Sequence, residues 1–169
     1  MHHQTRWTLQ KISRRLMLIE PLVYRRQQPI PPFRFLALTS PQDTPPVGLD
    51  VDDSDWNVIA PHSYWGEWRQ NFVLRTTFQV PADWEKDAPI ALSLPIGNAE
   101  DFIHPEALAY IDGVSYSACD RYHHEFALRA DWHDGQVHTL VLHGWTGTGL
   151  RGGQEGQLLM KPCAVVQID

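Results

Sequence analysis

The sequence predicts a mainly β protein, a jelly-roll β-sandwich preceded by one N-terminal α-helix. The first observation is a strand at 71–80, in which successive side chains alternate between the two faces of a sheet. The second is a series of short strands that continues to residue 168, joined by turns rich in Gly and Pro. Two packed sheets bury one face of each such strand. The buried face of 71–80 is expected to carry Phe72, Leu74, Thr76, Phe78 and Val80.

Residues 1–26 are expected to form a helical segment. Ile12, Leu16, Ile19 and Val23 recur at the spacing of one helix face, and Pro21 is expected to end or kink the helix. From 27 to 55, six prolines predict a connector that lies over the sandwich and contains only short extended pieces such as 33–37. The remaining range, 56–169, is expected to form the β-sandwich domain.

Further strands are predicted where apolar residues alternate over short stretches. Pro81 removes a backbone donor and ends the strand at 71–80. Asp112-Gly113 is a two-residue hairpin signal, and Pro162 marks a break or an edge in the last strand. The predicted strands are 90–96, 107–111, 114–117, 126–128, 137–143 and 157–168.

Composition excludes several classes of protein. The formal net charge of -6 argues against a nucleic-acid surface, which needs a basic patch. No apolar run approaches the ~20 residues that a membrane span requires, and basic residues near the N-terminus leave no apolar signal-peptide centre. Cys119 and Cys163 form no C-x-x-C motif, so reduced thiols in the cytoplasm are expected, with one disulfide as the alternative.

Two patterns suggest cofactors, but each has a plainer interpretation. Residues 147–152 read G-x-G-x-x-G, yet too few residues follow for a helix and a returning strand, which favours a simple loop. Histidines are frequent in the second half, but His138 and His143 should face opposite sides of one strand. No cofactor or metal is therefore expected in this chain, and a metal site assembled across strands is the alternative.

Four residues are candidates for a carbohydrate or domain-interface site, namely Asp120, His123, Trp65 and Trp145. Asp120 and His123 lie three residues apart in a loop, where a hydrogen bond would hold one imidazole tautomer. The pair suits acid–base chemistry, a structural role or a contact to a neighbouring domain, and the last two are favoured. Tryptophan rings can stack on sugars, although most of them here are expected to be structural. No catalytic residue is assigned, because no nucleophile motif is present.

Three segments carry a family resemblance: PHSYWGEWRQNFVLRTTFQVPADW, EALAYIDGVSYSACDRYHHEFAL and VHTLVLHGWTG. Together they resemble the N-terminal domain of family 38 α-mannosidases, in particular the cytosolic and bacterial branch. The first segment is similar to galactose-binding-like jelly rolls in general, and the second is nearer to the mannosidases. At 117–119, Ser-Ala-Cys stands where the family usually has a Gln-Gly-type pair. The matching positions are Glu106, Ala107, Leu108, Tyr110, Asp112, Gly113, Asp120 and His123.

The resemblance implies a galactose-binding-like jelly roll that serves as the non-catalytic N-terminal module of an α-mannosidase-like glycoside hydrolase. It also implies that a zinc ion and an aspartate nucleophile belong to a catalytic domain that follows in the same polypeptide, so no activity is expected of this chain alone. The expected partners are that catalytic domain and carbohydrate, and a homo-oligomer is left open. Neither nucleic acid nor a membrane is expected as a partner. The alternatives are a free-standing carbohydrate-binding module and a jelly-roll metalloenzyme.

Overall fold

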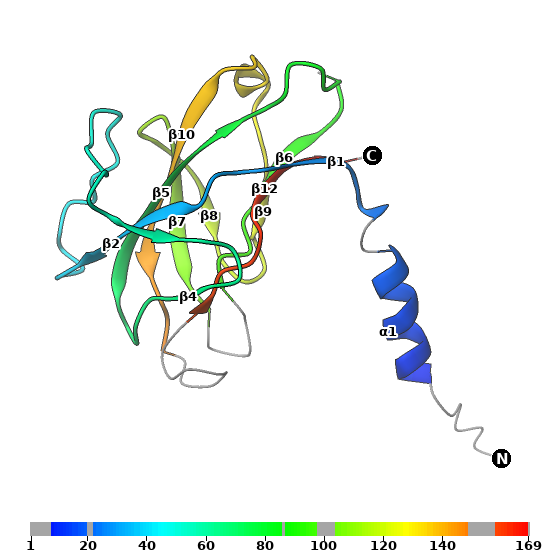
Figure 1. The fold of residues 1–169 in the computed structure, drawn as a ribbon, viewed down its shortest axis with the longest axis horizontal. Coiled ribbons are helices and arrows are strands. Elements are labelled where there is room, and N and C mark those ends of the chain that lie inside the picture. Colours follow the sequence, from blue (N-terminus) through cyan, green and yellow to red (C-terminus); the bar gives the residue numbers. More distant parts are fainter. Residues whose placement is uncertain (1–7, 20–21, 86, 98–103, 149–157, 169) are drawn as a thin grey trace.

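The computed structural model describes residues 8–19, 22–85, 87–97, 104–148 and 158–168. These residues form a mainly β fold in which antiparallel sheets pack face to face, with one helix at the N-terminal side (Figure 1). The predicted fold class, a β-sandwich with an N-terminal α-helix, is confirmed. The helix is α1 (Thr8–Ile19), and a short 3-10 turn lies at Ala130–Trp132.

Within the described ranges the strands form three sheets, and their pairs are all antiparallel. The six-stranded sheet has the order β3 (Asn57–Ile59), β2 (Phe33–Leu38), β5 (Asn71–Gln79), β10 (Val137–Trp145), β7 (Glu106–Ile111) and β8 (Val114–Cys119). The four-stranded sheet has the order β1 (Tyr24–Pro29), β12 (Ala164–Ile168), β6 (Ile90–Ser93) and β9 (Glu125–Ala127). A small third sheet pairs β11 (Leu158–Leu159) with β4 (Tyr64–Trp65).

The core lies between the two large sheets, as the alternation in β5 predicted. All five predicted side chains at 72–80 are at most 7% exposed. They meet apolar side chains from the facing sheet, such as Ile90 and Leu92 of β6 and Val165 of β12. Asp112 and Gly113 both have positive φ, 51° and 80°, as the predicted two-residue turn between β7 and β8 requires.

One expectation about β5 needs correction, because its other face is also covered in part. Val73 is fully buried and Arg75 is 6% exposed, although both alternate with the core residues. The Arg75 guanidinium donates to the carbonyls of Gly48 and Leu49 at 2.9 and 3.4 Å. The segment around residues 48–53 therefore packs on the outer face of the six-stranded sheet, which local alternation in β5 could not reveal.

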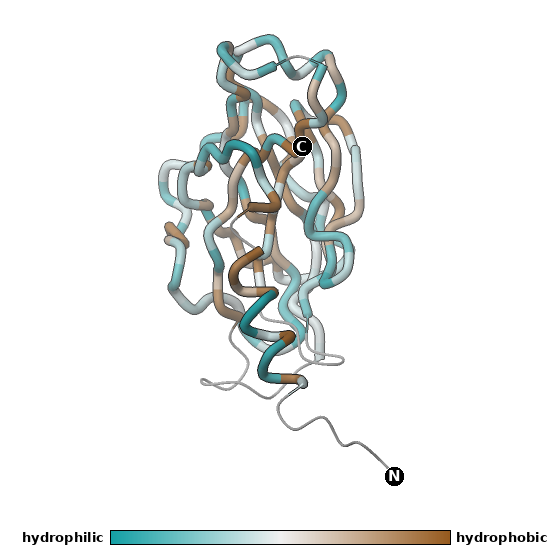
Figure 2. Tube along the Cα trace, turned by 90° about the vertical axis from the view of Figure 1, so that its right-hand side faces the viewer, coloured by the Kyte–Doolittle hydropathy of each residue, from teal (hydrophilic) through white to brown (hydrophobic). Residues whose placement is uncertain are grey.

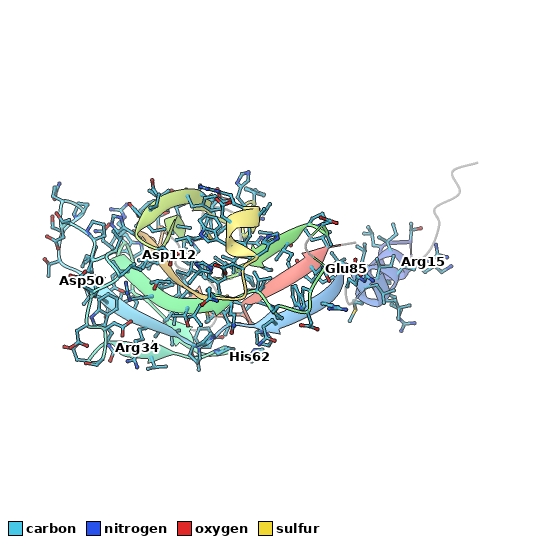
Figure 3. The ribbon with its side chains drawn as sticks, turned by 90° about the horizontal axis from the view of Figure 1, so that it is seen from above. Arg15, Arg34, Asp50, His62, Glu85 and Asp112 are labelled. Atoms are coloured by element: carbon cyan, nitrogen blue, oxygen red, sulfur yellow. The ribbon has the colours of Figure 1, made fainter. Side chains whose placement is uncertain are left out.

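A carboxylate in this segment adds to its contacts with the sheet. Arg34 of β2 and Arg75 of β5 are direct cross-strand partners, an arrangement that places two like charges side by side. Asp53 lies between them, with one carboxylate oxygen 3.4 Å from Arg34 Nε and the other 3.2 Å from Arg75 Nε. Figure 3 shows Arg34 and Asp50 on the side of the molecule opposite Arg15 of α1.

Two strands of the sandwich begin in ranges that were expected to lie outside it. These ranges are the expected helical segment (1–26) and the expected connector (27–55). β1 starts at Tyr24 and pairs with β12, and β2 covers the short extended piece expected at 33–37. The β1 sequence, YRRQQP, has no apolar alternation, so only its pairing with β12 makes it a strand.

The Tyr24 side chain lies on the outer face of the four-stranded sheet. The Tyr24 hydroxyl on edge strand β1 donates to Glu125 on the opposite edge strand β9. The Tyr24 and Glu125 side chains therefore reach toward each other from the two edges, over β12 and β6, where small residues lie beneath them. The side chains in this second apolar cluster include Ala91, Ala164 and Val166. Small residues at these positions leave room for the phenol ring.

The helix α1 contributes no buried residue to the described structure. Figure 1 shows it standing away from the sandwich, and Figure 2 shows both hydrophobic and hydrophilic residues along it. The predicted apolar stripe is present, but Ile12, Leu16 and Ile19 are each about half exposed. Within the described ranges, no helix has the length and apolar character that crossing a bilayer requires.

Candidate functional site

The four candidate residues from the sequence lie at one end of the sandwich, called here the β4 end. Trp145 is the last residue of β10 and pairs with Glu106, the first residue of β7. Cys119, the last residue of β8, pairs with the second residue of β7, so Asp120 follows at the same end. Trp65 belongs to β4 itself, which Figure 1 places at the lower end of the sandwich.

Asp120 and His123 form the predicted hydrogen bond. His123 Nδ1 lies 3.0 Å from each carboxylate oxygen of Asp120. Oδ1 of the same carboxylate also accepts the backbone N–H groups of Tyr122 at 2.6 Å and His123 at 2.8 Å. Burial by itself would raise the pKa of Asp120, but the hydrogen bonds from the His123 ring and the two backbone donors outweigh it and lower that pKa. The loop therefore presents a fixed carboxylate.

A cleft of about 270 Å³ opens beside this carboxylate, and we call it the Asp120 cleft. Its polar side chains are Asp120, Arg121, His124 and Lys161. Apolar and backbone groups form the remainder of the wall, at 94–97 and at Pro105. Sequence reasoning found Asp120 but missed Lys161, since nothing in the chain around residue 161 signals a position beside the 120–124 loop.

Trp65 lies in the core, so it offers no ring face to a ligand. It is 2% exposed, and its indole N–H donates to the Ile96 carbonyl at 2.7 Å. Phe35 and Phe72 pack edge-on against it, with ring centroids 5.9 and 4.9 Å away. The expectation that Trp65 contacts carbohydrate or a domain interface is thus corrected, because ring packing and the indole hydrogen bond hold its side chain in the core.

Trp145 is more accessible and lies on the outer face of the six-stranded sheet. Its indole N–H donates to Glu106 Oε2 at 3.0 Å. The Glu106 side chain is 56% exposed, and its other oxygen lies 3.5 Å from His104 Nε2. An aromatic ring beside a carboxylate is a combination that can contact a sugar through its C–H face and its hydroxyls.

At the opposite end of the sandwich, sequence reasoning missed a buried ionisable group. His138 is 8% exposed, with Nδ1 2.7 Å from Asp112 Oδ2 and Nε2 3.1 Å from Asp134 Oδ1. As expected, His143 is on the other face of β10 from His138, five residues along the strand. No cluster of three metal-binding side chains occurs within the described part of the chain.

The G-x-G-x-x-G pattern lies only partly within the described residues. Gly147 and Thr148 begin the G-x-G-x-x-G pattern, but its residues 149–152 lie outside the described residues. Cys119 and Cys163 are both buried and free, in agreement with the expectation of reduced thiols. Burial, helped by the charge of Asp120, raises the pKa of Cys119 to about 12, so this thiol is not a nucleophile near neutral pH.

No family model matches the chain, and no curated protein matches its sequence. Among solved structures, the fold is similar to the crystal structure of β-glucuronidase from Bacteroides uniformis, with a TM-score of 0.53 and 18% sequence identity. That similarity covers 84% of this chain but only 18% of the enzyme, so the chain spans less than a fifth of its neighbour's length. The comparison shows that the fold resembles a β domain of a glycoside hydrolase, and it leaves the resemblance to family 38 as a hypothesis.

Proposed function

We propose that this chain is a non-catalytic β-sandwich module of an α-mannosidase-like glycoside hydrolase, which packs against the catalytic domain and contacts carbohydrate. The observation that carries the proposal is the match of 84% of the chain to 18% of a glycoside hydrolase. The segments that resemble the N-terminal domain of family 38 α-mannosidases supply the finer part of the proposal. The zinc ion and the aspartate nucleophile that this family implies would belong to the catalytic domain, outside these 169 residues.

The loop at 120–124 is the surface proposed to face the catalytic domain. Tyr122 is 72% exposed at its tip, and the Arg121 guanidinium lies 5.1 Å from the centre of the Tyr122 ring. Tyrosine and arginine are the residue types that contribute most often to protein interfaces. The hydrogen bonds from Tyr122 and His123 to Asp120 hold the loop in one conformation, which lowers the entropy cost of docking.

The experiment is to express the whole open reading frame that contains this chain and to assay hydrolysis of aryl α-mannosides. In the intact enzyme, Tyr122→Ala should lower activity or the melting temperature, whereas in the isolated module it should change neither fold nor stability. Val137→Ala is the matched control, because Val137 is 64% exposed at the other end of the sandwich. A reading frame whose product lacks a catalytic domain, or a Tyr122→Ala enzyme with unchanged activity and melting, would contradict the proposal.

The alternative function is a free-standing carbohydrate-binding module, favoured by the pairing of Trp145 with Glu106 on an accessible face. Calorimetric titration of the isolated chain with mannose-type oligosaccharides tests it. Saturable binding that Trp145→Ala removes would support this second function, while the module proposal requires only the effect of Tyr122 on the intact enzyme. Either function is proposed to operate in the cytoplasm, as a monomer or a homo-oligomer.

A further inference from the structure

Two neighbouring hollows lie along the C-terminal half of β5, toward the end of the sandwich opposite the β4 end. Their volumes are about 660 and 280 Å³. Pro31 and Thr77 line both hollows, so the two meet at these residues, and we call them together the Thr77 groove. Arg34, labelled in Figure 3, lines the smaller hollow. The lining residues come from 28–34, 51–53, 75–81 and 137–139, each of which lies inside a described range.

The groove contains hydrogen-bonding groups that the protein itself leaves unused. Thr77 and Thr139 are direct cross-strand partners, and their hydroxyls form no hydrogen bond with any described residue. Gln79 Nε2 donates to the Gly135 carbonyl at 2.7 Å, whereas Gln79 Oε1 has no partner among the described residues. Arg34 uses Nη1 and Nε in its contacts, so within the same residues both N–H groups of Nη2 stay available. The groove therefore presents both donors and acceptors to a ligand.

The charged side chains of the groove are paired with one another. Asp53 lies between Arg34 and Arg75, with contacts of 3.4 and 3.2 Å. Among the described residues, no other charged side chain lines either hollow. An ionic ligand would have to compete with this pairing. A neutral ligand with many hydroxyls suits the groove better, because each hydroxyl both donates and accepts.

The wall at 29–32 argues against an extended peptide as the ligand. Its three prolines have no backbone N–H. The remaining residue of this wall, Ile30, donates its N–H to the Cys163 carbonyl at 3.1 Å. No backbone donor is left there to pair with an added strand, which is how sheet edges usually bind peptides. The rings of Pro29 and Pro31 are exposed and offer apolar surface to the C–H face of a sugar.

Both walls of the groove are held in place before any ligand binds. Thr76 Oγ1 donates to the Pro31 carbonyl at 3.0 Å, which fixes the wall that the two hollows share. The Arg75 contacts with the carbonyls of Gly48 and Leu49 fix the opposite wall. A preformed groove lowers the entropy cost of binding. Its larger hollow, about 660 Å³, is within the usual range of ligand sites.

We propose that the Thr77 groove binds a neutral oligosaccharide of about two or three sugar units. Gln79 hydrogen-bonds to sugar hydroxyls in the larger hollow, Arg34 and Thr139 do so in the smaller hollow, and Thr77 does so where the hollows meet. The choice of a carbohydrate rests on the proposed function, whereas the neutral character and the position rest on the groove itself. The site is at the other end of the sandwich from Trp145.

The experiment is an NMR titration of the ¹⁵N-labelled chain with mannotriose, cellotriose and D-mannose. Amide shifts should localise to Thr77, Gln79 and Thr139. We expect one or both trisaccharides to bind at least about fivefold more tightly than D-mannose, because only a longer sugar spans both hollows. Raising the salt to about 0.5 M should change the affinity less than about twofold, since the ligand is neutral. An acetylated and amidated tetrapeptide of valine and threonine tests the competing ligand class.

Threonine-to-valine variants link binding to the groove. Thr77→Val combined with Thr139→Val removes both hydroxyls but keeps β-branched side chains, so the native amide spectrum should persist while binding weakens at least about fivefold. Thr77→Val alone should weaken binding at least about twofold. Thr44→Val is the matched control, because Thr44 is exposed and lines neither hollow, and it should leave binding unchanged.

Four results would overturn the proposal. They are the absence of trisaccharide binding below ~20 mM, tetrapeptide binding of equal strength, amide shifts centred on Trp145, and a double variant that binds like the wild type. The readout is binding to this chain alone. Failure here is therefore distinguishable from failure of the proposed function, which Tyr122→Ala tests in the intact enzyme.

Discussion

Replacing His138 by alanine should destabilise the protein by about 3 kcal/mol at about pH 6 and by clearly less at about pH 9. The ring of His138 bridges Asp112 at 2.7 Å and Asp134 at 3.1 Å. It also packs on Phe78, with ring centroids 5.4 Å apart. The two charge-assisted bonds supply part of this loss, reduced because the two carboxylate side chains are 35% and 43% exposed and water screens them. The lost ring contact supplies the remainder.

The pH dependence follows from the direction in which the pKa of His138 moves. Burial by itself lowers this pKa, but the hydrogen bonds and charges of Asp112 and Asp134 outweigh it, so the pKa is raised above 6.5. The protonated ring can donate from both nitrogens at once. The folded state therefore holds its proton more tightly than the unfolded state. This contribution is fully present below the unfolded pKa of about 6.5 and is lost as pH rises through the folded value.

Urea unfolding followed by tryptophan fluorescence, at several pH values from about 6 to 9, measures this effect. A loss of about 3 kcal/mol corresponds to a fall in melting temperature of roughly 6 to 12 °C for a chain of this length. His124→Ala is the control, because the His124 ring is exposed and its Nδ1 lies 3.2 Å from the Arg121 carbonyl oxygen in its own loop, with no carboxylate bonded to it among the described residues. If the loss of unfolding free energy caused by His138→Ala stays constant or grows toward pH 9, the ring is not protonated and hydrogen-bonded to both carboxylates, and the assignment is refuted.

Three further predictions concern packing and the two thiols. Gly144→Ala should cost about 3 kcal/mol or more, because a Cβ atom there would lie 2.0 Å from the Glu106 carbonyl oxygen; a wild-type melting temperature would contradict this close approach of β10 and β7. Asp53→Asn should cost about 1 to 2 kcal/mol in urea unfolding, since it leaves two paired arginines side by side, and an unchanged midpoint would show that this carboxylate does not hold the 48–53 segment. Cys119 and Cys163 should react with an aromatic disulfide reagent only as the protein unfolds, because burial raises both thiol pKa values, so fast labelling of the native protein would be the contrary result.

Local sequence signals predicted the elements whose pattern is complete within a few residues. The alternation from Phe72 to Val80 placed β5 in the core, and Asp112-Gly113 marked the β7–β8 turn. The Asp120–His123 hydrogen bond was equally local, since its partners lie three residues apart. Each of these features depends on backbone geometry that neighbouring residues determine on their own.

Features that join distant segments were not predictable in the same way. The strand β1 has a polar sequence, and its pairing with β12 brings together residues more than 130 positions apart, as in Pro29 and Ala164. The inward position of Trp65 depends on Phe35, Phe72 and Leu158. No window of the sequence contains these partners together, so no periodicity could have indicated them.

Alternating side chains and turn residues were sufficient to predict an antiparallel β-sandwich, and apolar residues at helical spacing were sufficient to predict the helix before it. Only the tertiary structure decided which polar groups meet: Lys161 beside the Asp120 loop, and His138 between Asp112 and Asp134. The physical reason is that strand formation depends on the next few side chains, whereas a cleft or an ion pair depends on which loops the two sheets bring to the same end.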